Sequence, residues 1–233
     1  MIITTKRGTP MKQNNSIIFD MDGVIFDTEQ LYIDCCKAVA DKFHMGDDAF
    51  VEALCHRCIG VTREVTRQNI LDTYGEDFPI DDYFADSSRE FQKRFGDGKH
   101  MIKPGVAELF AYLKQENFRI ALASSTRTAA LTKELDDAGL LQNFDVIVGG
   151  DQVERSKPAP DIFLKAAELL GAEPSECYVL EDSYNGISAA HNAGMIPIMV
   201  PDLLPPTDEM REKAAAILDS LYEVINYLQE VTA

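Results

Sequence analysis

The chain has 233 residues, of which 45% are hydrophobic and 26% are charged, a composition typical of folded globular proteins and unlike that of disordered or fibrous ones. Its 22 basic and 39 acidic residues give a formal net charge of −17. This charge argues against nucleic acid or a membrane as a partner, since nucleic acid and anionic membranes are bound mainly through Lys and Arg. Five cysteines, an odd number without the spacing of a disulfide framework, indicate a reducing, cytoplasmic location.

The first segment, residues 1–15, has no apolar stretch long enough for a signal peptide or a membrane span. We expect a loose N-terminal tail, in which Met11 is an alternative start of translation. Residues 17–19 (Ile-Ile-Phe) then form a short apolar run, which predicts a strand buried on both faces.

Helical spacing of apolar residues begins after this strand and continues to about residue 98. It is clearest in the recurrence, every four residues, of Leu31, Cys35, Val39 and Phe43. We recognise no strand pattern in this block, which therefore predicts a compact helical unit. Cys55 and Cys58 form an isolated CxxC pair within it, and without a second pair of ligands nearby we expect neither a zinc site nor a redox site there.

Beyond residues 104–105 (Pro-Gly) strands and helices alternate. The predicted strands are 120–123, 146–148, 178–180 and 196–200, and the predicted helices are 106–113, 131–135, 162–170, 187–193 and 217–228. Such alternation indicates βαβ units, and therefore an α/β fold with a Rossmann-like, doubly wound parallel sheet and helices on both faces.

The strand at 17–19 must join this sheet, because one short strand is not stable alone. The α/β core is then expected to comprise residues 16–29 and 99–233, with residues 30–98 inserted as an all-helical cap domain. The insertion follows the carboxyl end of the first strand, where open α/β sheets bind ligands.

Polar residues follow the first predicted strand. Asp20 and Asp22 come directly after it, and two carboxylates so close together repel each other unless one is protonated or both share a cation. Oxygen ligands of this kind suit a hard ion such as Mg²⁺. The alternative is a turn in which Asp and Gly23 serve the backbone geometry. We reject a calcium loop, because a strand and not a helix precedes the acids.

Three further strand ends carry Ser124-Ser125-Thr126, Lys157 and Glu181-Asp182. The hydroxyls and N–H groups of 124–126 can cradle a phosphate, although Ser and Thr are also common helix caps. A fixed lysine can neutralise a transferring phosphoryl group, although an isolated lysine is usually solvated. Each feature alone is weak evidence. Four such ends in one series of βα units predict a phosphoryl-transfer site.

With these four motifs in this order, the chain resembles the haloacid dehalogenase-like superfamily, and within it the β-phosphoglucomutase-like phosphatases with a helical cap. The resemblance covers nearly the whole chain and rests on Asp20-x-Asp22-Gly-Val, Ser124, Lys157-Pro-x-Pro-Asp161 and Glu181-Asp182. It implies phosphate chemistry and not carbon–halogen cleavage, since true dehalogenases lack an acid at the position of Asp22.

The resemblance also implies a role for each motif. Asp20 would be the nucleophile that forms an aspartyl-phosphate, and Asp22 would protonate the leaving oxygen and later activate water. The phosphoryl oxygens would be bound by Ser124, Ser125 and Lys157. The Mg²⁺ ligands would be the carboxylates of Asp20 and Asp182 and the backbone carbonyl of Asp22, with Glu181 helping directly or through water.

The cap segment matches the family in part. Thr28 in the hinge and Gly60 and Arg63 in the cap loop match positions that would bind substrate, although Arg63 is alternatively a solvated residue at the head of a helix. The β-phosphoglucomutase pattern has a histidine where this chain has Tyr32 and a lysine where it has Ile59. Both departures remove groups that would engage a sugar phosphate.

We therefore expect a phosphoric monoester hydrolase, a monomer that hydrolyses a small phosphorylated metabolite with Mg²⁺ and through an aspartyl-phosphate; a sugar phosphate is one candidate substrate. The alternative is a phosphomutase of the β-phosphoglucomutase type. A further alternative is a non-catalytic regulator that binds a phosphorylated metabolite, whose mark would be a broken motif.

Overall fold

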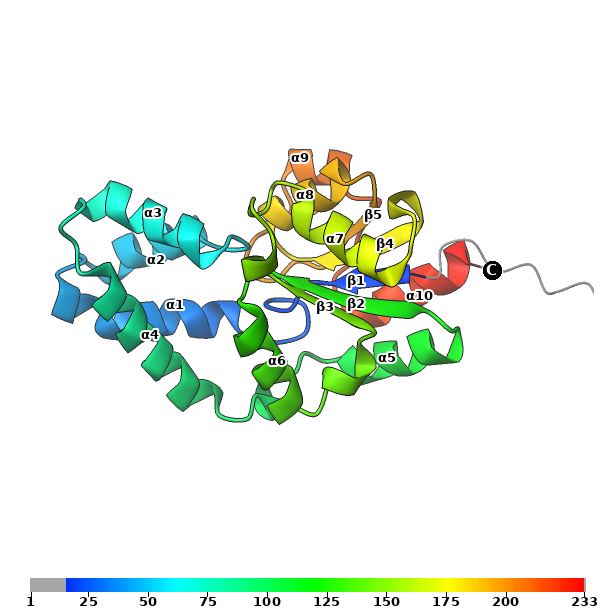
Figure 1. Ribbon diagram of the computed structural model, residues 1–233, viewed down its shortest axis with the longest axis horizontal. Helices are drawn as coiled ribbons and strands as arrows, with labels where there is room; N and C mark the ends of the chain where they lie inside the picture. The colour runs from blue at the N-terminus through cyan, green and yellow to red at the C-terminus, as the bar shows by residue number, and fades with distance from the viewer. Residues whose placement is uncertain (1–15, 233) are drawn as a thin grey trace, which may run out of the picture.

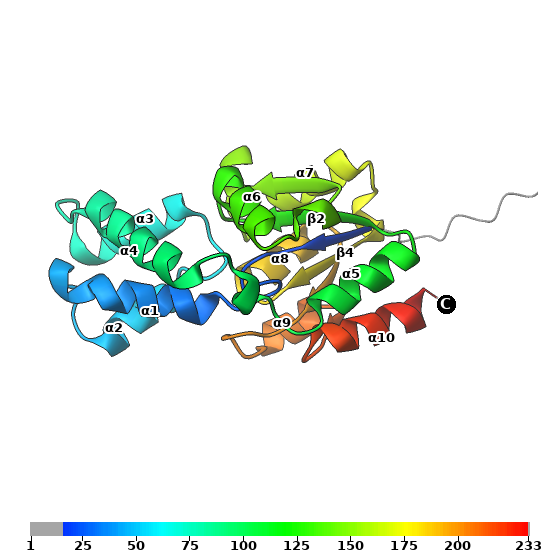
Figure 2. The same ribbon diagram turned by 90° about the horizontal axis from the view of Figure 1, so that it is seen from below.

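The structure, a computed structural model, describes residues 16–232, so the tail predicted for residues 1–15 lies outside the described part of the chain. Figure 1 and Figure 2 show two groups of elements along the longest axis of the molecule, a set of helices at one end and a sheet with covering helices at the other.

The sheet has six strands in the order β3-β2-β1-β4-β5-β6, and every neighbouring pair is parallel. Its strands are β1 (Ser16–Phe19), β2 (Arg119–Ser124), β3 (Val146–Gly149), β4 (Cys177–Glu181), β5 (Ile196–Met199) and β6 (Ala216–Ile217). The predicted α/β fold with a doubly wound parallel sheet is therefore confirmed.

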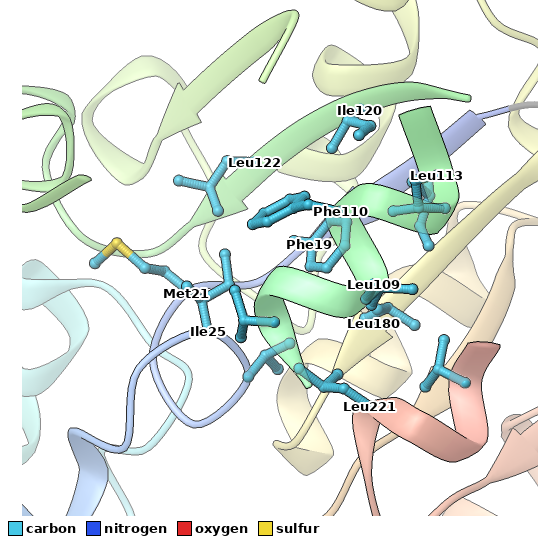
Figure 3. Close-up of a cluster of buried hydrophobic side chains, with 14 of the residues drawn as sticks. Phe19, Met21, Ile25, Leu109, Phe110, Leu113, Ile120, Leu122, Leu180 and Leu221 are labelled. Carbon is cyan, nitrogen blue, oxygen red and sulfur yellow. The ribbon is translucent and has the colours of Figure 1, made fainter. Parts of the chain in front are cut away.

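Side chains alternate across the central strand and bury both faces of the sheet. Ile17 and Phe19 belong to the cluster on one face, against α5 (Val106–Gln115), α6 (Thr128–Asp137) and α10 (Leu221–Val231). Ile18 points to the other face, against α7 (Asp161–Leu170) and α8 (Tyr184–Asn192). Figure 3 shows the first cluster, in which the rings of Phe19 and Phe110 have centroids 5.3 Å apart.

Four helices follow β1 and pack on an apolar cluster of their own. They are α1 (Glu29–Ala40), α2 (Asp48–His56), α3 (Arg63–Tyr74) and α4 (Ile80–Phe95). The segment 30–98, all of which the structure describes, contains no strand. The insertion is thus an all-helical cap, as predicted, and its separate core is the basis on which we propose residues 30–98 as the domain limits.

The last part of the sheet differs from the prediction. Ile217 was expected to begin the final helix, and this is wrong: it lies in β6, opposite Met199 of β5, and the helix begins at Leu221. A strand of two residues has no readable period, so the apolar spacing was assigned to the helix that follows. The short helix α9 (Asp208–Lys213) was also not predicted.

Single 3₁₀ turns occur in several connections, at Asp41–Phe43, Lys99–Met101, Leu141–Asn143, Gly150–Gln152 and Pro174–Glu176. None of the helices within residues 16–232 has both the length and the hydropathy that crossing a membrane requires.

We expect Leu109→Ala to lower the free energy of unfolding by about 2–5 kcal/mol, because Leu109 has no exposed surface and its removal leaves a cavity against the sheet. Urea unfolding followed by circular dichroism measures this change; the chain contains no tryptophan for fluorescence. The matched control is Leu169→Ala on α7, a side chain that is 54% exposed and should cost within about 0.5 kcal/mol. Equal losses for the two variants would contradict the assignment of the core.

Candidate active site

The parallel register brings the predicted site residues to one edge of the sheet. Phe19, the last residue of β1, lies opposite Leu122 of β2 and Leu180 of β4. Asp20 follows directly, while the neighbouring strands end at Ser124 and Glu181. The chain leaves β1 for β2 on one side and returns to β4 on the other, so this edge is the topological switch point at which α/β folds bind ligands.

Lys157 links three of these strand ends. Its side chain has no exposed surface, and its Nζ donates to Asp20 Oδ1 at 2.5 Å and to Glu181 Oε1 at 2.6 Å. A third bond, of 3.2 Å, reaches the carbonyl oxygen of Ala123. Although burial alone lowers the pKa of an ammonium group, the charges of Asp20 and Glu181 raise the pKa of Lys157, so it stays protonated.

Glu181 is held by the start of the following helix. Its second carboxylate oxygen, Oε2, accepts bonds from the backbone N–H of Ser183 at 2.8 Å and from Ser183 Oγ at 2.9 Å. The Ser183 hydroxyl oxygen in turn accepts from the N–H of Gly186 and so caps α8. Both oxygens of Glu181 are therefore engaged within the protein.

The Asp22 carboxyl group is oriented by two hydroxyls. Thr28 Oγ1 donates to one of its oxygens at 2.6 Å and Thr126 Oγ1 to the other at 3.2 Å. Burial raises the pKa of Asp22 above its usual range, and the two hydrogen bonds reduce this shift. A carboxyl group of this kind can hold a proton at a higher pH than an exposed aspartate.

Asp182 is the residue that follows β4. It is 2% exposed, and its Oδ2 has no hydrogen-bond partner. Burial, followed by the charge of Glu181, raises the pKa of Asp182 well above its usual range. Burial likewise raises the pKa of Asp20, to about 7. Lys157 supplies one positive charge against the three carboxylates of Asp20, Glu181 and Asp182, so these residues fit a bound cation.

The donor set is made of hard oxygen atoms, which suits Mg²⁺. Among residues 16–232, no three side chains of His, Cys, Asp or Glu are grouped closely enough to hold a metal ion by themselves. A set of two carboxylates with one backbone carbonyl does not require such a group. The loop that follows β1 packs closely against Asp182, because a Cβ atom at Gly23 would lie 2.4 Å from Asp182 Oδ2.

A cavity of about 350 Å³ opens in front of this edge, between the sheet and the helical cap. Of the predicted site residues, seven line it: Asp20, Asp22, Thr28, Gly60, Arg63, Ser124 and Ser125. The other three, Lys157, Glu181 and Asp182, do not line it and are buried at the sheet edge. The size of the cavity suits a small metabolite.

The loop around Gly60 and Thr62 in the cap is hydrogen-bonded to the core beside the strand-end motifs. Ser125 Oγ donates to the carbonyl oxygen of Gly60 at 3.0 Å, and the backbone N–H of Thr62 donates to Ser156 Oγ at 2.9 Å. Arg63 is the first residue of α3, which follows this loop, and its guanidinium carbon lies 4.3 Å from the centre of the Phe84 ring. The Ser125 hydroxyl therefore holds the cap.

Besides the predicted residues, the cavity is lined by others, among them Thr126 and Glu134, and Ser156 bonds the cap beside it. Thr126 belongs to the predicted motif 124–126 and Ser156 stands next to Lys157, and this adjacency is the signal that could have identified their roles. Glu134 on α6 has no such signal. It lines the cavity at 8% exposure, and burial, with the charge of Asp22 next in importance, raises its pKa to about 8.

Comparisons with known proteins extend over most of the chain. A family model described as haloacid dehalogenase-like hydrolase matches residues 17–200. The phosphorylated carbohydrates phosphatase of Thermotoga maritima is 33% identical over 224 residues, covering 93% of this chain and 99% of that protein. The β-phosphoglucomutase of Bacillus subtilis is 33% identical over 193 residues, covering 79% and 82%. The crystal structure of CbbY from Rhodobacter sphaeroides in complex with phosphate has a TM-score of 0.74 at 27% identity, covering 90% of this chain and 96% of that one.

Glu134 makes the stability of the protein depend on pH. Between its ordinary pKa near 4.5 and its folded pKa of about 8, the folded chain binds a proton that the unfolded chain does not. The free energy of unfolding must therefore fall as pH rises through this window. We expect Glu134→Gln to abolish this contribution, so that the variant gains on the order of 2–3 kcal/mol relative to wild type between pH 5 and pH 8.

Urea unfolding of both proteins at pH 5, 6.5 and 8 measures this difference, and subtraction cancels the other titrating groups. Parallel pH dependences of the two proteins would show that Glu134 titrates as an ordinary carboxylate.

Proposed function

The chain belongs to the haloacid dehalogenase-like hydrolases, in agreement with the family resemblance of its motifs, and on this premise we propose that it is a Mg²⁺-dependent phosphatase of a small phosphorylated sugar, with the Asp20 carboxylate as nucleophile. The observation that carries this proposal is the position of Asp20, which lines the cavity and at the same time bonds to the buried ammonium group of Lys157.

In the first step an oxygen of Asp20 attacks phosphorus, and the bond from phosphorus to the ester oxygen of the substrate breaks. The product alcohol leaves with that electron pair, and Asp20 becomes an aspartyl-phosphate. A carboxylate is a weak nucleophile toward an anionic phosphate ester, so the reaction depends on neutralising charge and on in-line positioning. Lys157, which stays protonated, supplies part of that positive charge.

Asp22 moves the protons of both steps. Its pKa is raised by burial, so it can give a proton to the leaving oxygen. It can then accept a proton from the water that attacks the aspartyl-phosphate, which releases phosphate and restores Asp20. The bonds from Thr28 and Thr126 fix the carboxyl group for this role.

Ser124 is suited to bind the phosphoryl group. Its Oγ accepts a bond from the N–H of Thr126 at 3.1 Å, which leaves its own hydrogen free to be donated to a phosphoryl oxygen. Ser125 lies beside it, but its hydroxyl is already donated to Gly60. We therefore assign the contact through a hydroxyl to Ser124 and the closing of the cap to Ser125.

The metal ligands in this proposal are the carboxylates of Asp20 and Asp182 and the backbone carbonyl of Asp22. Glu181 would contribute through water or by positioning Lys157, because both of its oxygens are engaged. When bound there, Mg²⁺ supplies positive charge that polarises the phosphoryl oxygens.

A phosphomutase is the second candidate, favoured by the similarity to the β-phosphoglucomutase of Bacillus subtilis. Tyr32 and Ile59 weigh against it. The phenol of Tyr32 has no basic nitrogen and burial raises its pKa well above its usual range, so it is neutral and cannot supply the positive charge that a histidine can carry. Ile59 is 5% exposed and presents an apolar side chain where a lysine would offer an ammonium group.

We expect the purified protein with Mg²⁺ to release phosphate from at least one member of a panel of sugar phosphates, nucleotides and p-nitrophenyl phosphate. Asp20→Asn should lower kcat/KM at least about 10³-fold, because it removes the nucleophile. The matched control is Asp34→Asn, the same change at an exposed position on α1.

No phosphate release from any of these esters would refute the phosphatase. Conversion of β-glucose 1-phosphate to glucose 6-phosphate, stimulated by the bisphosphate and followed by a coupled assay, would instead establish the mutase.

We expect removal of divalent cations with EDTA to abolish phosphate release and added Mg²⁺ to restore it. Asp182→Asn should raise the Mg²⁺ concentration needed for half-maximal activity, because it replaces one of the two carboxylate ligands with a neutral amide. A titration of activity against Mg²⁺ for both proteins measures this shift. Full activity in excess EDTA would remove the metal from the mechanism.

A further inference from the structure

Two helices, α4 of the cap and α6 of the core, also line the cavity. On the cap side, one face of α4 lines it, with residues at helical spacing: Phe84, Ser87, Ser88, Phe91 and Gln92. On the core side, α6 presents Ala130 and, one turn later, Glu134. The proposed reaction assigns no role to these residues.

Glu134 is an acid placed where an ordinary carboxylate is unfavourable. It is 8% exposed, and it lines the cavity together with Gln92 of α4. Burial and the nearby charge of Asp22 raise its pKa to about 8, so the carboxyl group is largely protonated at neutral pH. A neutral carboxylic acid both donates and accepts hydrogen bonds, as does the amide of Gln92.

The wall of the cavity is largely apolar, but α4 carries two further hydroxyl groups close to this pair in sequence. Ser87 Oγ is buried without a hydrogen-bond partner, and Ser88 stands next to it on the lining of the cavity. Hydroxyl, amide and neutral carboxyl groups on the wall of one cavity suit a ligand that carries hydroxyls of its own. A ligand without hydroxyls would leave the buried groups of Glu134 and Ser87 without a partner from the ligand, which is costly.

We infer that Glu134 and Gln92 determine substrate specificity, by binding hydroxyl groups at the end of the substrate that carries no transferring phosphate. This inference rests on the proposed phosphatase function. A substrate hydroxyl that enters between the two side chains can donate to one and accept from the other. Because Glu134 belongs to the core and Gln92 to the cap, both bonds form together only when the cap lies over the sheet edge. The enzyme therefore selects polyhydroxylated phosphate monoesters, the class of sugar and polyol phosphates.

The test compares kcat/KM for a panel of sugar and polyol monophosphates with kcat/KM for phenyl phosphate, which has no hydroxyl groups. We expect Glu134→Ala to lower the value for the best hydroxylated substrate about tenfold or more, mainly through KM, and to change that for phenyl phosphate less than about twofold. Glu134→Gln, which keeps a donor and an acceptor, should restore most of the loss. Gln92→Ala should show the same selective pattern, and because Gln92 is exposed we expect its loss to change the free energy of unfolding by less than about 0.5 kcal/mol.

Matched controls come from the same two helices. Asp136→Ala on α6 and Lys93→Ala on α4 remove charged, exposed side chains that do not line the cavity, and neither should alter the ratio of the two values. Equal losses on both kinds of substrate in Glu134→Ala and Gln92→Ala would overturn the inference, as would a wild-type preference for phenyl phosphate. Phenyl phosphate also separates the two proposals: if wild type hydrolyses it, the phosphatase stands whatever the variants show, and if wild type hydrolyses no ester, both fall.

Discussion

The buried ammonium group of Lys157, shared between Asp20 and Glu181, is the interaction on which the arrangement of the site depends. Removing these charges from water is costly, and the cost is offset only if every group is paired with good geometry. Asp20 and Lys157 come from the connections that follow β1 and β3, and Glu181 is the last residue of β4. A shift of any one strand would leave a buried charge unpaired, so the ion pairs couple the register of the parallel sheet to the position of Asp20.

Close packing fixes the same group from behind. A Cβ atom at Gly186, in the first turn of α8, would lie 1.8 Å from the carboxyl carbon of Glu181. The helix can therefore approach the strand end closely enough for Ser183 to bond Glu181, and it does so only because residue 186 has no side chain. With one oxygen held by this helix start, the other oxygen of Glu181 remains directed at Lys157. The absence of a side chain at Gly186 thus bears on the position of Asp20 through Glu181 and Lys157.

The sheet and the strand-end motifs could be predicted because they depend on local patterns and on one rule of topology. Apolar runs bounded by turn residues identify β1 to β5, and parallel pairing then requires their carboxyl ends to meet. The placement of Ile217 was wrong because an edge strand of two residues has no period. Glu134 could not be predicted, since an acid on an amphipathic helix is usually solvated. Glu134 is buried because α6 and the cap, which are far apart in sequence, come together around the cavity.

The contacts between cap and core show why the insertion follows β1. Each core residue that binds the cap loop stands close in sequence to a residue of the site: Ser125 follows Ser124, and Ser156 precedes Lys157. Asn185 donates to the carbonyl of Ile59 from the start of the helix whose cap, Ser183, holds Glu181. Separating the cap from the core must therefore break hydrogen bonds made by the residues next to Ser124 and Lys157. A movement of the cap would in this way be coupled to the positions of the two residues that we propose to bind phosphate.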